Sequence, residues 1–378
     1  MKSKMLIVST GLAMFSMFFG SGNLVFPLLV GQLSQGHYVL GALGIFLTGV
    51  VVPFLGILAM LLFNGDSTSF FSRLGRRATF WAPLIALSLM GPFGVLARCI
   101  AVAHGAFRLL LPETPLWLFS LIGCLILFAL TIRKNRIVPV LGSVLTPLLL
   151  VALAAIALFS LLGSNLPTPS ALGSWASFKQ GILQGYQTMD LLAAFFFSAF
   201  VIKHLKEQEP NPAASLPIFF KSSLIGAGLL SSIYCVLVLL GAIHADALAH
   251  VPPQEMLGTV ASLSLGPLAG PVVATTAILA CLTTAIVLTS LFADFLKKEV
   301  CKDKLPMSVS VATTLAIAFC ISTLNFQGIM KVLGPILEYT YPALIVMTVT
   351  SIFHKLWGLK IVRTPIAIAV LLKVLSAI

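Results

Sequence analysis

The feature that most constrains this chain is a series of long apolar runs separated by short connectors. Runs of about 20 residues cross about 30 Å of hydrocarbon as helices, because each residue adds about 1.5 Å. A helix also satisfies its own backbone hydrogen bonds, which lipid cannot do. We therefore expect an all-α integral membrane protein with about eleven transmembrane helices, within residues 6–30, 38–62, 80–110, 116–132, 138–162, 181–202, 215–242, 267–296, 306–324, 327–353 and 361–378.

The composition excludes a water-soluble globule. Hydrophobic residues make up 59% of the 378 residues, and charged residues only 9%, whereas soluble domains are about 25% charged. The six cysteines lack the close spacing of metal sites, so no metal cluster or disulfide framework is expected.

The positive charges predict how the chain is oriented. With the N-terminus inside, eighteen Lys and Arg residues lie at the inner ends of the spans and four at the outer ends. Short cytoplasmic loops carry such an excess of basic residues. The net charge of +12 therefore predicts a cytoplasmic N-terminus, and a nucleic-acid partner is not needed to explain it.

Two spans contain polar, glycine-bearing stretches. The first span includes Gly20, Ser21, Gly22 and Asn23, and the sixth opens with residues 181–190, which are again polar and rich in glycine. Glycine weakens a helix, and unpaired backbone groups in hydrocarbon must line a cavity or hold a ligand. We expect broken helices here, with backbone ends free to bind; close packing of small residues is the alternative explanation for Gly20 and Gly22.

The positions of the two stretches suggest an internal repeat. Five spans run from the first interruption to the second, so the second half enters the membrane from the opposite side. We expect a first five-helix repeat over residues 1–162, a second, inverted one over 163–353, and an additional C-terminal helix over 354–378.

At these residues the chain resembles the bacterial branched-chain amino acid carriers, which are leucine, isoleucine and valine:cation symporters of the amino acid–polyamine–cation superfamily. The matching segments, in order along the chain, are Phe18 to Pro27, Gly91-Pro92 with Arg98, Gly185 to Asp190, Ala280 to Ala285, and Tyr341-Pro342.

The resemblance implies a transporter in a bacterial cytoplasmic (inner) membrane. It implies a 5+5 inverted repeat with substrate held between broken helices 1 and 6, and cation-coupled uptake by alternating access. The coupling ion is Na⁺ or H⁺, and no other cofactor is expected. Family members usually have twelve spans, and we expect the difference from about eleven here to affect subunit contacts more than transport.

A branched-chain amino acid needs an anion site and an apolar pocket. The backbone amides of Ser21, Gly22 and Asn23, at the positive end of a half-helix, are the candidate site for its carboxylate. Its side chain is expected among aromatic and aliphatic groups such as Phe195.

The ammonium group needs oxygen acceptors. The backbone carbonyl of Phe18 is one candidate, and the carbonyls or side chains of Tyr186, Gln187 and Met189 supply others from the second break.

The sodium site follows from the same resemblance. Thr283 and Thr284 lie one turn beyond Ala280 on the eighth span, and Ser16 and Phe19 carbonyls complete five oxygens. In the alternative reading, the two threonine hydroxyls only bond back to carbonyls of their own helix.

Ionisable residues within membrane spans are functional candidates. Arg98, Asp190, Glu338 and His104 qualify. Arg98 with Asp190 or Glu338 is interpreted as either a structural ion pair or a gate or proton relay.

Other classes of function have less support. The sequence holds no nucleophile elbow and no HExxH zinc motif, so an intramembrane enzyme is disfavoured. A channel is disfavoured because two broken helices suit an occluded site better than a pore. Carriage or exchange of another neutral amino acid remains the main alternative.

Overall fold

The computed structural model describes residues 2–132, 146–162, 172–208, 212–358 and 364–368, together with positions 167 and 169. Throughout these residues the ordered elements are helical, and no strand occurs among them. Five helical segments are long and apolar enough to cross a membrane: Ser21–Leu62, Ala78–Phe107, Leu216–Ile243, Pro253–Val300 and Asn325–Trp357. Shorter apolar helices lie between them.

The expected spans correspond to helices or helix pairs. The larger elements are α1 (Lys2–Phe18), α2 (Ser21–Ser34), α3 (Tyr38–Phe46), α4 (Val52–Leu62), α5 (Ser67–Ser72), α6 (Ala78–Met90), α7 (Val95–Phe107), α8 (Leu116–Ile132), α10 (Thr146–Leu162), α11 (Ser174–Gln187), α12 (Asp190–Gln208), α13 (Pro212–Ile243), α15 (Met256–Leu265), α16 (Ala269–Phe295), α17 (Met307–Ser322) and α18 (Asn325–Trp357). A π-helical turn, Leu47–Val51, joins α3 to α4 without a break. The short helix α14 (Ala245–Leu248) lies in a connector.

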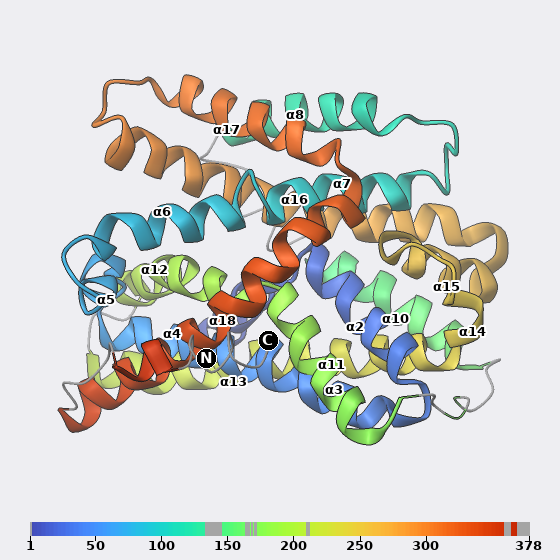
Figure 1. Ribbon diagram of the computed structural model, residues 1–378, viewed down its shortest axis with the longest axis horizontal. Helices are drawn as coiled ribbons and strands as arrows, with labels where there is room; N and C mark the ends of the chain where they lie inside the picture. Colours follow the sequence, from blue (N-terminus) through green and yellow to red (C-terminus); the bar gives the residue numbers. More distant parts are fainter. Residues whose placement is uncertain are drawn as a thin grey trace.

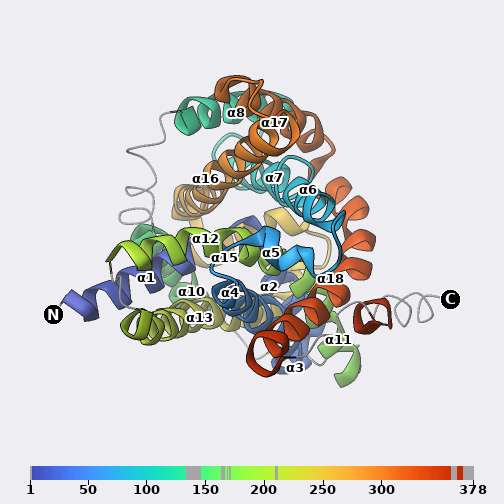
Figure 2. The same ribbon diagram turned by 90° about the vertical axis from the view of Figure 1, so that its left-hand side faces the viewer.

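Two layers of helices make up most of the molecule (Figures 1 and 2). The first layer contains α1–α4 and α11–α13; α3 packs on α11, α13 on α1 and α2, and α12 on α4. The second layer contains α6–α8, α16 and α17, with α16 against α7 and α17 against α8. In Figure 1, α18 runs diagonally across both.

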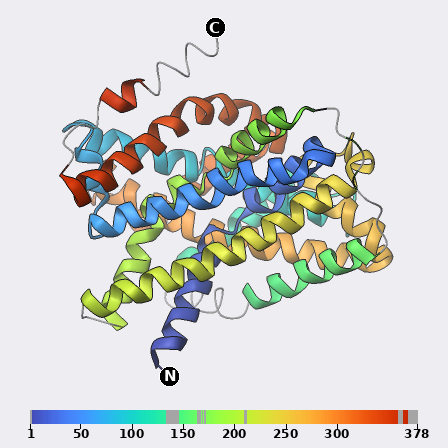
Figure 3. The ribbon, with the colours of Figure 1, turned by 90° about the horizontal axis from the view of Figure 1, so that it is seen from below.

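Glycines bring backbones of the first layer together. A Cβ at Gly181 of α11 would overlap the Gly41 carbonyl oxygen of α3, and one at Gly31 of α2 would overlap the Val238 carbonyl oxygen of α13. Helix α13 packs on α2 and crosses the face that is seen from below (Figure 3). These helices approach more closely than any side chain would permit.

Three boundaries differ from the sequence prediction. The window 80–110 is not one continuous helix: α6 ends at Met90 and α7 begins at Val95, because the turn through Gly91 and Gly94 interrupts it. The sixth span begins at Ser174 rather than at 181. Residues 138–145 of the fifth window and most of 361–378 lie outside the described residues.

Candidate functional site

The first span is broken where its glycines and polar residues lie. Helix α1 ends at Phe18, α2 begins at Ser21, and Gly20 between them is extended, with φ −130° and ψ −159°. Asn23 holds the new helix start, since its Oδ1 accepts a hydrogen bond of 2.9 Å from the Gly20 amide. The last carbonyls of α1 and the first amides of α2 are thereby released from helical pairing.

The sixth span is broken as well. Helix α11 ends at Gln187 and α12 begins at Asp190. Met189 between them has φ +59°, a left-handed conformation that is costly for a residue with a side chain. Thr188 turns its hydroxyl back to the Gly185 carbonyl at 2.9 Å.

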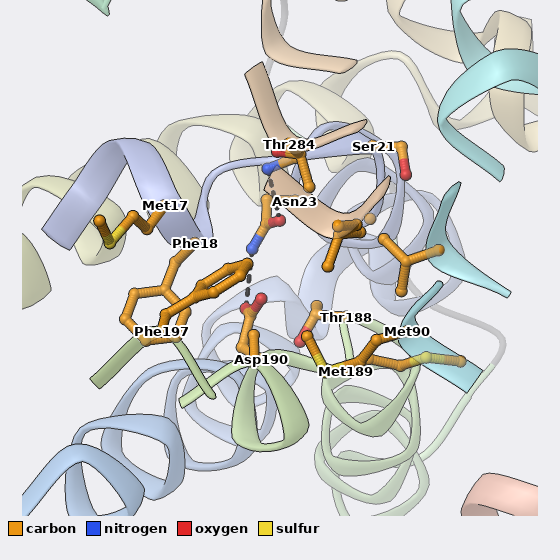
Figure 4. A pocket seen from close by; sticks show the side chains of 15 residues that line it. Met17, Phe18, Ser21, Asn23, Met90, Thr188, Met189, Asp190, Phe197 and Thr284 are labelled. Carbon is orange, nitrogen blue, oxygen red and sulfur yellow. Dashed lines mark hydrogen bonds between the residues drawn. The ribbon is translucent and has the colours of Figure 1, made fainter. Parts of the chain in front are cut away.

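The two breaks face each other. A Cβ at Gly22 would lie 3.2 Å from Thr188 Cα, so glycine permits the close approach. The Asn23 amide Nδ2 donates to Asp190 Oδ2 at 2.8 Å, and the two side chains point toward each other across the site (Figure 4). Both explanations of Gly20 and Gly22 therefore hold: the helix is broken there, and the small residues also allow close packing against the second break.

A small cavity of about 20 Å³ lies at this meeting point. Residues from both layers line it: Met17, Phe18, Gly20, Ser21, Gly22, Asn23, Met90, Val95, Thr188, Met189, Asp190, Ala193, Phe197, Thr284 and Leu288. Phe18 and Phe197 lie side by side, with ring centroids 6.2 Å apart, and form an aromatic wall (Figure 4). The cavity thus combines polar helix ends with an apolar wall, as ligand pockets do.

Oxygen atoms gather beside the first break. Thr284 of α16 approaches the Phe19 carbonyl at 3.4 Å and donates to the Ala280 carbonyl at 3.2 Å, while Thr283 donates to Ala280 at 2.9 Å. A Cβ at Gly20 would lie 2.9 Å from Thr284 Oγ1. Ser16 lies one turn before the break on α1. Both threonines bond within their own helix, as the alternative reading expects, but Thr284 also reaches the break.

Three expected pocket residues lie outside the cavity lining. Phe195 packs instead against Phe70 and Phe71 of α5, with ring centroids 4.9 Å and 5.7 Å away. Tyr186 stacks on Tyr341 of α18 at 5.0 Å. Gln187 is buried, and its Oε1 has no hydrogen-bond partner among the described residues.

Arg98, interpreted from the sequence as paired with Asp190 or Glu338, forms no hydrogen bond with either carboxylate, although its charge acts on Asp190. Arg98 is fully buried, its guanidinium lies 5.4 Å from the Phe26 ring centroid, and its three side-chain nitrogens have no hydrogen-bond partner in the described part of the chain. Asp190 is held by Asn23 instead, and Glu338 lies half-buried on α18. His104 makes a local contact with the Thr114 carbonyl at 2.8 Å.

Sequence reasoning missed several residues of the site. Tyr234 of α13 accepts a hydrogen bond from Asn23 Nδ2 at 2.6 Å and donates one to Asp190 Oδ2 at 3.2 Å. Met17, Met90 and Phe197 line the cavity. The one sequence signal for Tyr234 is a polar hydroxyl within a long apolar run.

Solved structures of transporters share this fold. A nucleobase-cation-symport-1 family transporter, Mhp1, closed around bromovinylhydantoin, aligns over 98% of this chain and 91% of its own, with TM-score 0.64 and 13% identity. MhsT in complex with L-phenylalanine aligns over 98% of each chain, with TM-score 0.59 and 17% identity. At such identities these likenesses concern the fold alone.

Sequence relatives are closer. Branched-chain amino acid permease BraB of Bacillus subtilis is 30% identical over 92% of this chain and 80% of its own length. Branched-chain amino acid permease BrnQ of Corynebacterium glutamicum is 29% identical over 94% and 82%. The profile of the family described as "Branched-chain amino acid transport protein" matches residues 2–378. The resemblance inferred from the motifs is therefore confirmed: this chain belongs to the branched-chain amino acid transport protein family.

Proposed function

We propose that this protein is a secondary active transporter that couples uptake of leucine, isoleucine or valine to the entry of Na⁺ or H⁺. The observation that carries the proposal is the cavity between two facing helix breaks, because it offers charged and dipolar groups to the two ends of an amino acid and apolar groups to its side chain. The names of the relatives favour branched-chain substrates.

In this proposal the substrate carboxylate meets the first amides of α2, at Ser21, Gly22 and Asn23. An N-terminal helix end carries about half a positive charge and has free donors. The aliphatic side chain of the substrate lies against Phe18 and Phe197, which form the aromatic wall of the cavity. Tyr186 and Gln187 then support the α11 end without touching the substrate.

The coupling cation is proposed to bind beside the substrate, at the Thr284 hydroxyl and the carbonyls of Phe19 and Ala280, with Ser16 and Thr283 completing the oxygen set. Sodium is a hard cation for which oxygen ligands are suited. The distances of 3.4 Å and 3.2 Å from Thr284 to the two carbonyls support this, since the ligands already lie together.

The 5+5 inverted repeat, over residues 1–162 and 163–353, belongs to the same proposal. It is supported by the matching interruptions after Phe18 and Gln187. The cytoplasmic N-terminus is supported by the distribution of basic residues.

The test is uptake of radiolabelled leucine, isoleucine and valine into proteoliposomes under a sodium gradient, a proton gradient or neither. We expect accumulation against a concentration gradient with one of the two cations. Failure to accumulate these amino acids under either gradient overturns the proposal. Preferential uptake of a neutral amino acid without a branched side chain overturns it as well. Uptake that occurs only when the vesicles are preloaded with amino acid identifies an exchanger instead.

A further inference from the structure

Asp190 is the only ionisable residue among those that line the cavity. It is the first residue of α12, directly after the left-handed Met189, and its side chain is 3% exposed. A carboxylate at such a depth is costly unless it has a use. What the carboxylate does in this position is therefore a question about function.

Neutral groups hold this carboxylate in place. Asn23 Nδ2 and the Tyr234 hydroxyl both donate to one oxygen, Oδ2, at 2.8 Å and 3.2 Å. Asn23 is itself fixed, because its Oδ1 accepts the Gly20 amide. The N-terminal end of α12 further stabilises a negative charge here. The arrangement fixes the direction of the carboxylate.

Among the described residues, Arg98 is a cation whose charge acts on this carboxylate, but it does so at a distance and without a hydrogen bond. Arg108 pairs with Glu255, and Lys297 pairs with Asp303. Arg98 is the nearest candidate in the sequence pattern, but its guanidinium lies over Phe26 and hydrogen-bonds to no carboxylate. A buried carboxylate whose direct contacts are neutral donors can still attract a cation that enters the cavity.

We infer that the Asp190 carboxylate binds the α-ammonium group of the transported amino acid, with Asn23 and Tyr234 as positioning residues. This rests on the proposed function and adds to it a named charged partner. The carbonyl end of α1, at Phe18, borders the same cavity and adds a second negative dipole. The amide end of α2 attracts the carboxylate of the substrate, so the cavity matches both charges of a zwitterion.

The arrangement predicts discrimination by the amino group. Leucine presents an ammonium, whereas 4-methylpentanoate has the same carbon skeleton and carboxylate without it. A carboxylate in the wall favours the first compound and repels the second. If backbone carbonyls alone bound the ammonium group, the preference for leucine over 4-methylpentanoate would not depend on Asp190.

The test compares binding of the two compounds to purified full-length protein, by competition against radiolabelled leucine. In Asp190→Asn, the acceptor for Asn23 is kept and the charge is lost. We expect the preference for leucine over 4-methylpentanoate to fall at least about tenfold, because hydrogen bonds to charged groups are the stronger ones. Asp246→Asn, on an exposed connector, is the matched control and should keep the preference.

A second variant covers the case in which Asp190→Asn does not fold. Tyr234→Phe removes only the hydroxyl that bonds to Asp190, and it should shift leucine affinity a few-fold without changing 4-methylpentanoate affinity. Equal losses for both compounds in either variant overturn the assignment of Asp190 while leaving the transport function standing. Wild-type protein that binds no branched-chain amino acid overturns the proposed function itself.

Discussion

The two layers of the molecule pack in different ways. In the first layer, helices meet backbone to backbone at glycines: α3 meets α11 at Gly181, and α2 meets α13 at Gly31 and Gly241. In the second layer, side chains separate the helices, as where Cys124 of α8 reaches the Leu315 carbonyl of α17 at 3.6 Å. Gly123 of α8 has no atom within 4 Å of where its Cβ would be.

This difference indicates which parts move together. Interlocked backbones have no room to slide, so the first layer is suited to move as one rigid body. The cavity lies at the boundary, with α1, α2 and α12 on one side and α6, α7 and α16 on the other. Transporters that work by alternating access rock one such body against another around a fixed site.

The largest expected effect comes from filling a backbone contact of the first layer. In Gly181→Ala, the new Cβ overlaps the Gly41 carbonyl, so α3 and α11 must separate. We expect a loss of about 3 kcal/mol in the free energy of unfolding, the upper part of the range for overpacking. Thermal denaturation in detergent measures it.

The control for this variant is Gly123→Ala in the second layer, where the Cβ meets nothing within 4 Å. It should be neutral, or stabilising by about 0.5–1 kcal/mol, because alanine favours a helix over glycine. Similar losses in both variants would show that the layers do not differ in packing.

The next effect concerns the boundary between the layers. Thr284→Ala removes the hydroxyl that contacts the Phe19 carbonyl. If Na⁺ is the coupling ion, the sodium concentration for half-maximal leucine uptake should rise about tenfold, with little change in leucine binding at saturating sodium.

Thr289→Ala is the control, since Thr289 lies on the same helix, is buried, and donates only to the Ala285 carbonyl at 2.7 Å. Its sodium activation should stay as in the wild type. Unchanged activation in Thr284→Ala as well removes the ion site from the boundary.

A smaller effect separates two neighbouring aromatics of α12. Phe197 lines the cavity, so Phe197→Leu should change the ratio of leucine to valine uptake several-fold. Phe195 packs against α5, so Phe195→Leu should leave that ratio unchanged and lower stability by about 1 kcal/mol. The reverse pattern in transport assays would show that the cavity lies on the other face of α12.

The smallest effect is expected for Arg98→Met. Because Arg98 has no hydrogen-bonded partner among the described residues, a long apolar side chain should replace it without loss of thermal stability. A structural ion pair would cost about 3–5 kcal/mol when broken. A drop of that size would show that Arg98 has an ion-pair partner.

Much of the fold was visible in the sequence, for a physical reason. Lipid permits few polar groups, so Gly20, Ser21 and Asn23 stand out against an apolar run, as do residues around Thr188. Both breaks therefore appear where the sequence predicts them. The turn at Gly91 to Gly94 went unrecognised because its neighbours are almost entirely apolar.

The content of the cavity was harder to predict. Phe195 and Phe197 lie two residues apart, about 200° around a helix, so they face different sides. Because the run is apolar on every side, its sequence does not show which of these faces lines the cavity. Tyr234 meets Asn23 across 211 positions of sequence, and no local pattern encodes such a contact. The ends of broken helices are thus predictable, whereas the side chains that surround them depend on packing.

Three methionines, Met17, Met90 and Met189, border the cavity from three different helices or their ends. The thioether side chain is unbranched and has three rotatable bonds, so it reshapes at low cost. A lining of that kind is suited to side chains that branch at the first side-chain carbon, as in valine and isoleucine, or at the second, as in leucine, without any movement of the backbone. The same methionines place oxidisable sulfur beside the substrate cavity. Their conversion to methionine sulfoxide would make the lining polar and narrow the range of side chains that it accepts.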